Sequence, residues 1–214
     1  MKQKFQNRDL LKWGCVQRLL HYYSLATREE IKDGKEWYNN ANKFCQSFEY
    51  PLTQVAGITA AFSPQAGWIE NKRYVSTYLK TGKVLRTKEQ KRKAEAILNT
   101  ENEVEILNLL SVRGLALKSK AFYLNILHPS VETSVTIDRH AVAACLQHYL
   151  ETESLGEVRL TKKQYGFFVE CYKDAAKRTG LLPHQFQAVV WVVYRRLKNL
   201  NNHNEKSHTE NDPF

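Results

Sequence analysis

The sequence lacks the features of a membrane or secreted protein. Its 214 residues contain no apolar run of about 18 residues, so a membrane span is excluded. The start, MKQKFQNRDLLKWG, is basic and then polar, without the apolar core and small-residue cleavage site of a secretory signal. We therefore expect a cytoplasmic protein that does not bind membranes.

Glycine, proline and cysteine are scarce. Nine glycines and five prolines are too few for a low-complexity chain or a turn-rich all-β chain. None of the four cysteines belongs to a C-x-x-C pair, and their spacing matches no zinc or iron–sulfur pattern. We expect reduced core thiols, no metal and no other cofactor. The cysteines are Cys15, Cys45, Cys145 and Cys171.

Basic residues outnumber acidic ones. Lysine and arginine total 32 against 22 aspartate and glutamate residues, which gives a formal net charge of +10. Such an excess favours a polyanionic partner such as nucleic acid. The alternative is a basic surface kept for solubility. The hydrophobic content of 43% is sufficient to fill a globular core.

Apolar residues recur with helical period along most of the chain, and no hairpin signal is present, so the sequence predicts an all-α fold. One helical domain is expected over 1–200. The polar stretch 201–214 has almost no apolar anchor and is expected to be a disordered tail. Helices are predicted over 9–24, 35–48, from Pro51 to 62, 68–79, 87–98, 103–110, 117–127, from about Asp138, and over 161–179 and 183–199.

The first segment with chemical interest is the turn Ser63–Pro64–Gln65. It follows an apolar helix at 55–62 and precedes another helix. Proline after serine fits a helix start, with Ser63 as the N-cap. An ordinary connection between two helices is one interpretation of this turn. The other is that Gln65 points outward to a ligand.

The second segment surrounds Gly114, which separates two short predicted helices. Glycine there allows a positive φ and a close approach to another chain. The N–H groups at the start of the following helix can hold a phosphate. Lys118 and Lys120 lie in its first turns, where a cation is electrostatically unfavourable. A functional role is one explanation, and a solvated helix face is the other.

The third segment, at 133–146, contains Asp138 and His140. Asp138 lies where an extended stretch meets a helix, so its simplest role is an N-cap. His140 is more simply explained as a hydrogen-bonded structural histidine than as a catalyst. A basic run from Arg86 to Lys93 could contact phosphates, although such a run is more often a solvated face.

Taken together, the three segments resemble the helix–hairpin–helix DNA glycosylase superfamily of the endonuclease III type. The resemblance covers about residues 52–147, while the flanks at 34–44 and 180–196 look like glycosylase-related proteins of phages and prophages. Some of those proteins are proposed to act on hypermodified thymine. The matching motifs are Ser63–Pro64–Gln65, Asn71–Lys72, the hairpin Gly114–Leu115–Ala116 and Ile137–Asp138–Arg139–His140. The family's hairpin usually has a second glycine where this chain has Ala116.

The resemblance implies a helix–hairpin–helix glycosylase-like bundle of about eight to ten helices with a cleft. The implied partner is double-stranded DNA, including DNA with modified bases, in a bacterial or phage-infected cell. The implied reaction takes place at the N-glycosidic bond or base of a deoxynucleotide flipped out of the duplex.

Roles for individual residues follow from the same resemblance. Asp138 would stabilise positive charge on the sugar, and Lys118, Lys120 or water would be the nucleophile. Gln65 would fill the gap left by the flipped base. The implied DNA contacts are Gln65, Ser63, Asn71, Lys72, Gly114 and Arg139. The implied base pocket is Trp68, Tyr123, Trp191 and His140, with core packing as the alternative for the aromatic residues.

Three other functions remain open at this point. One is a non-catalytic DNA-binding protein with the same fold. Another is a phage enzyme of that fold that hypermodifies DNA bases. The third is a helical adaptor that binds another protein, in which Asp138 would be only an N-cap. Lyase activity in addition to glycosylase activity would require a lysine nucleophile.

Overall fold

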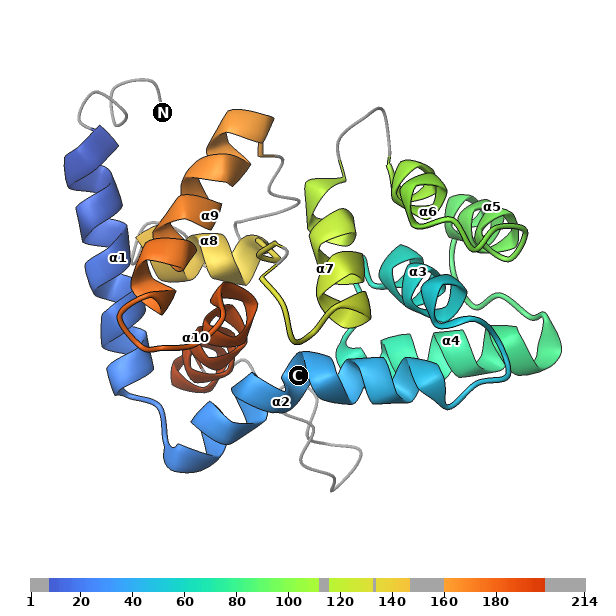
Figure 1. The fold of residues 1–214 in the computed structure, drawn as a ribbon, viewed down its shortest axis with the longest axis horizontal. Coiled ribbons are helices and arrows are strands. Elements are labelled where there is room, and N and C mark those ends of the chain that lie inside the picture. The colour runs from blue at the N-terminus through green and yellow to red at the C-terminus, as the bar shows by residue number, and fades with distance from the viewer. Residues whose placement is uncertain (1–7, 112–115, 133, 147–159, 199–214) are drawn as a thin grey trace. The chain divides into compact units, whose positions relative to one another are not determined.

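The computed structural model of the protein defines residues 8–111, 116–132, 134–146 and 160–198 (Figure 1). Every helix or strand assigned in these ranges is an α-helix, so the predicted all-α class is confirmed for them. None of these helices is long and apolar enough to cross a bilayer. The helices are α1 (Arg8–Ser24), α2 (Arg28–Gln46), α3 (Leu52–Phe62), α4 (Trp68–Thr81), α5 (Lys88–Ile97), α6 (Glu103–Leu110), α7 (Leu117–Leu127), α8 (Arg139–Leu146), α9 (Lys162–Ala176) and α10 (Pro183–Leu197).

The predicted helix bounds agree with the observed ones to within a few residues except at the start of α2. That helix begins at Arg28 rather than at 35. Thr27 and Glu30 form a capping box, in which the Glu30 N–H donates to Thr27 Oγ1 at 3.1 Å and the Thr27 N–H donates to Glu30 Oε2 at 2.8 Å. Gly34, just before the predicted start, lies inside the helix.

The helices group into two compact units, whereas the sequence predicts one domain. Unit 1 contains α1, α2 as far as Trp37, and α8 to α10. Unit 2 contains the rest of α2 from Tyr38, and α3 to α7. Periodicity shows which face of a helix is apolar but not which helices that face meets, so the division was not predictable. Gly114 and the expected tail at 201–214 lie outside the described residues.

In unit 1, α1 packs against α8, α9 and α10. Gly34 allows the first part of α2 to approach α10 closely. A Cβ atom at Gly34 would lie 2.4 Å from Val189 Cγ2 and 2.7 Å from the Val189 backbone nitrogen. Any side chain there would have to displace the backbone of α10.

In unit 2, α3 is central and contacts α4, α5, α6 and α7. Residues 54–62 of this helix are all buried, as the apolar sequence at 55–62 predicts. Thr87 is the N-cap of α5, as predicted, and its hydroxyl accepts the Gln90 N–H at 3.3 Å. Gly82 ends α4 in the left-handed conformation with φ of 70°.

Candidate functional site

The turn between α3 and α4 presents Gln65 in an unusual backbone conformation. Gln65 is exposed and has a φ of 58°, in the left-handed region that favours glycine. The Ala66 N–H donates to the Ser63 carbonyl at 3.2 Å, which closes a β-turn with Pro64 second and Gln65 third. This order is typical of a type II turn, whose third position prefers glycine or asparagine.

Two polar residues beside this turn have structural roles. Ser63 is the C-cap of α3, and the N-cap of α4 is Gly67, so the predicted N-cap role of Ser63 is wrong. Ser63 Oγ donates to the Ala60 carbonyl at 3.0 Å and is buried. Asn71 is only 1% exposed, and its amide donates to the Thr59 carbonyl at 3.0 Å. Burial removes Ser63 and Asn71 from the DNA contacts that the resemblance implies.

The aromatic residues of unit 2 pack against its helices. Trp68 is half-buried and meets Phe44 edge-on, with ring centroids 5.7 Å apart. The ammonium of Lys72 lies 5.8 Å from the Trp68 ring. Tyr123 is fully buried on α7, the helix that packs against α3, so it belongs to the core rather than to a base pocket.

The segment before α7 also has a left-handed residue. Ala116, the N-cap of α7, has φ of 38° and ψ of 37°. Lys118 and Lys120 follow in the first turns of this helix, and both are half-buried. Lys93 is buried, and its ammonium donates to the carbonyl of Leu110, the last residue of α6, at 2.9 Å. Burial lowers the pKa of Lys93, so this lysine of the basic run is not on a solvated face.

Asp138 precedes the first residue of α8 and is held by two donors. The Ala141 N–H donates to Oδ1 at 2.8 Å, which is the N-cap interaction that the sequence predicts. The indole N–H of Trp191, on α10, donates to Oδ2 at 3.2 Å. Both carboxylate oxygens are therefore oriented, and the side chain remains half-buried.

Basic and aromatic side chains surround this carboxylate within unit 1. His140 lies edge-on to Trp191, with ring centroids 6.1 Å apart. The guanidinium of Arg195 lies 4.5 Å from the Trp191 ring centroid. Arg139 is exposed, and its Nε–H donates to His140 Nε2 at 3.4 Å. The structure thus brings Trp191, from α10, next to Asp138 and His140 at the start of α8.

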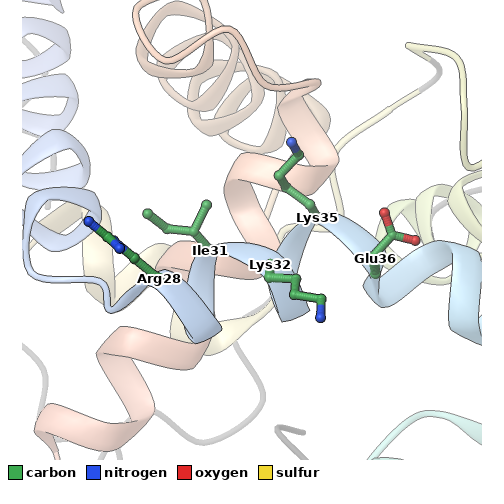
Figure 2. A pocket seen from close by; sticks show the side chains of 5 residues that line it. All are labelled: Arg28, Ile31, Lys32, Lys35 and Glu36. Carbon is green, nitrogen blue, oxygen red and sulfur yellow. The ribbon is translucent and has the colours of Figure 1, made fainter.

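A basic groove lies on the first part of α2. It has a volume of about 220 Å³ and combines three cations with one carboxylate and one apolar side chain. Figure 2 shows the five lining side chains, which are Arg28, Ile31, Lys32, Lys35 and Glu36. This excess of positive charge suits a phosphate-bearing partner. None of the candidate site residues predicted from the sequence lines this groove.

Three of the four cysteines converge in unit 1, and all four are free and buried. Hydrogen bonds from the thiols of Cys145 and Cys171 lower the pKa of Cys15, as does the charge of Arg18. Arg18 Nη2 lies 3.7 Å from Cys15 Sγ, and Arg18 Nε donates to the Cys145 carbonyl at 2.5 Å. The described residues contain no group of histidine, cysteine, aspartate or glutamate side chains arranged to hold a metal ion.

The family model of DUF7178, a family of unknown function, matches residues 1–198. The chain belongs to this family. The match includes both units and all the helices described above. No curated protein and no solved structure matches the chain. For this DUF7178 member, the function must therefore be argued from the site itself.

Sequence reasoning missed several residues that shape the candidate site in this DUF7178 member. Arg86 was considered only as part of a basic run, although its guanidinium donates to the Pro64 carbonyl at the Gln65 turn. Arg195 and Arg18 carry no local sequence signal that distinguishes them from other arginines of the chain. No signal in the sequence pairs Arg86 with Pro64, because 22 residues separate them.

Proposed function

We propose that this chain is a DNA glycosylase-like enzyme with a cleft that receives a flipped, modified deoxynucleotide. It acts at the N-glycosidic bond or base of that nucleotide in double-stranded DNA. The observation that carries the proposal is the left-handed backbone of Gln65 and Ala116. Among the described residues, these two are the non-glycine positions with positive φ. They lie in the turn and the hairpin to which the resemblance assigns DNA contact.

Left-handed backbone at a residue with a side chain costs about 1–2 kcal/mol. Such strain persists only where the surrounding structure imposes it, and it is concentrated at functional sites. At Ala116 the conformation also agrees with the resemblance, because the family's hairpin usually has glycine at this position. The peptide N–H groups at the start of α7, the helix that Ala116 caps, can bind a phosphate.

Asp138 supplies the chemistry in this proposal. Its carboxylate is held in one orientation by the Ala141 N–H and the Trp191 indole N–H, so no reorganisation is needed during the reaction. A fixed negative charge stabilises the positive charge that develops on the sugar as the glycosidic bond breaks. The nucleophile is water or the amine of Lys118 or Lys120.

The decisive experiment compares base release by the wild-type chain and Asp138→Asn. Asparagine caps helices as well as aspartate does, so α8 keeps its cap while the charge is removed. We expect mass spectrometry to detect a free base released from one member of a panel of duplexes that includes hypermodified phage DNA. Asp138→Asn should lower this release by about a hundredfold or more and leave duplex affinity nearly unchanged.

The matched control is Asp174→Asn. This change removes the same charge from a carboxylate in unit 1 that pairs with Lys12 at 2.7 Å. It should leave base release intact. Equal activity of Asp138→Asn and the wild-type chain on a substrate duplex would refute the catalytic role.

A non-catalytic DNA-binding protein is the second candidate. It is favoured by the N-cap bond to Ala141, which explains Asp138 without any chemistry. This candidate predicts salt-dependent duplex binding by the wild-type chain and no base release from any DNA in the panel. Binding to DNA that does not change with salt would contradict both candidates.

A further inference from the structure

The Gln65 turn is anchored at both ends by side chains of unit 2. At one end, a guanidinium nitrogen of Arg86 donates to the Pro64 carbonyl. At the other end, the Gly67 N–H donates to Glu70 Oε2 at 3.4 Å. Gln65 lies between these anchors, with its side chain exposed.

Tyr74 connects the two anchors. Its hydroxyl donates to Glu70 Oε1 at 3.4 Å, and the Arg86 guanidinium lies 4.9 Å from its ring centroid. A closed path of contacts therefore runs from Pro64 through Arg86, Tyr74 and Glu70 to Gly67. A planar guanidinium can stack on the ring and donate to the carbonyl at the same time, which a lysine ammonium cannot.

Arg86 is itself held in place by the start of α5. It directly precedes Thr87, the N-cap of that helix. Gln90, the third residue of α5, accepts the Thr87 N–H at 3.2 Å and donates to the Ala61 carbonyl near the end of α3 at 3.2 Å. The same few residues thus connect the start of α5 to the end of α3, where the turn begins.

We infer that Arg86 is a positioning residue that holds the strained turn in the conformation that presents Gln65 to DNA. The inference rests on the proposed function and extends it to a residue that need not touch DNA. A preformed turn would insert Gln65 into the duplex without first losing conformational freedom, which strengthens binding.

Arg73 provides a matched control for this role. Its guanidinium lies 5.3 Å from the same Tyr74 ring, but its interaction with Tyr74 does not extend to the turn. Arg86→Lys and Arg73→Lys each keep the charge and replace a guanidinium beside Tyr74. Only Arg86→Lys removes a guanidinium that connects the Tyr74 ring to the Pro64 carbonyl.

The experiment measures duplex affinity and base eversion, the latter from the fluorescence of 2-aminopurine placed in the duplex. We expect Arg86→Lys to lower affinity and eversion by about tenfold, and Arg73→Lys to change them less than about twofold. In a Gln65→Ala background, Arg86→Lys should cause no further loss, since the side chain that it positions is absent. Amide exchange at Ala66 should accelerate in Arg86→Lys alone, because this N–H closes the turn.

The outcomes separate this inference from the proposed function. Equal losses in the two arginine variants would overturn the inference and leave the proposed function standing. A further loss from Arg86→Lys in the Gln65→Ala background would also overturn it, since Arg86 would then contact DNA independently. A wild-type chain that binds no duplex would overturn the proposed function itself, whatever the exchange at Ala66 shows.

Discussion

Trp191 donates its indole N–H to Asp138 across 53 residues of sequence, at 3.2 Å. This bond joins α10 to the start of α8 and orients a carboxylate that would otherwise only cap a helix. The bond also fixes the position of the Trp191 ring, on which the guanidinium of Arg195 stacks.

Trp191→Phe tests this bond. Phenylalanine keeps an aromatic ring but cannot donate to Asp138, so we expect the free energy of unfolding to fall by about 1–2 kcal/mol. Urea denaturation followed by circular dichroism measures the change. Trp13→Phe is the control, because Trp13 is 60% exposed and should give almost no change. An equal effect of the two substitutions would mean that the bond to Asp138 contributes nothing.

Gly34→Ala should disrupt unit 1. The added Cβ would lie 2.4 Å from Val189 Cγ2 and 2.7–2.8 Å from Val189 backbone atoms, so α2 or α10 must move. We expect a loss of at least about 2 kcal/mol in stability. Gly166→Ala, within α9, is the control, since its Cβ would meet nothing within 4 Å. That change should instead stabilise the protein, by about 0.5–1 kcal/mol. Thermal or urea unfolding of the two variants should therefore shift in opposite directions.

Ala116→Gly should relieve strain before α7. Glycine adopts φ of 38° without steric cost, but it also loses more entropy on folding, so we expect a net gain of up to about 1 kcal/mol. Under the proposed function, removal of the Cβ should also strengthen duplex binding, because a phosphate can approach more closely. Ala96→Gly, inside α5, is the control and should destabilise by about 1 kcal/mol. Destabilisation by both changes would argue against strain at Ala116.

The cluster of three cysteine thiols in unit 1, Cys15, Cys145 and Cys171, gives a pH-dependent prediction. The pKa of Cys15 is lowered by hydrogen bonds from Cys145 and Cys171 and by Arg18, whereas burial raises the pKa of Cys45 to about 12. We therefore expect a thiolate at neutral pH, seen as absorbance near 240 nm. Cys15→Ser should abolish this absorbance, and Cys45→Ser should leave it unchanged.

The effect of Cys15 on stability has a definite sign. Because its folded pKa lies below the unfolded value of about 8.5, the stabilisation is full above that pH. It declines as the pH falls toward the lowered folded value. Stability of the wild-type chain relative to Cys15→Ser should therefore increase from pH 6 to pH 8.5, by about 1.4 kcal/mol for each pH unit. A constant difference over this range would show that Cys15 remains a thiol.

The basic groove on α2 gives a prediction that depends on DNA binding. Lys32→Gln and Lys35→Gln should each reduce the slope of log affinity against log salt by about 0.9, the value for one phosphate contact. Fluorescence anisotropy with a labelled duplex at several salt concentrations measures this slope. Lys177→Gln is the control, since Lys177 pairs with Asp174 at 3.6 Å outside the groove. Unchanged slopes in the two α2 variants would exclude the groove from the DNA contact.

Local features of the site were predictable, and their surroundings were not. The helix start that follows Asp138 and the one that precedes Lys118 could be inferred from the boundary of a periodic pattern. The exposure of Gln65 follows from a proline-containing turn. Asn71 and Tyr123 were misjudged because a motif or an apolar stripe does not show which side chains the fold buries. Arg86, which holds the Gln65 turn, lies just before α5, and no local sequence pattern links it to the turn.

The sequence alone determined most of the helices, the caps at Thr87 and Asp138 and the positive charge, because these depend on residues within a turn or two of one another. The tertiary structure decided which side chains meet. It joined Trp191 to Asp138, Arg86 to the Pro64 carbonyl and Val189 to Gly34. Such pairings depend on how whole helices cross and pack, and that packing is set by the combined burial of many side chains rather than by any local pattern.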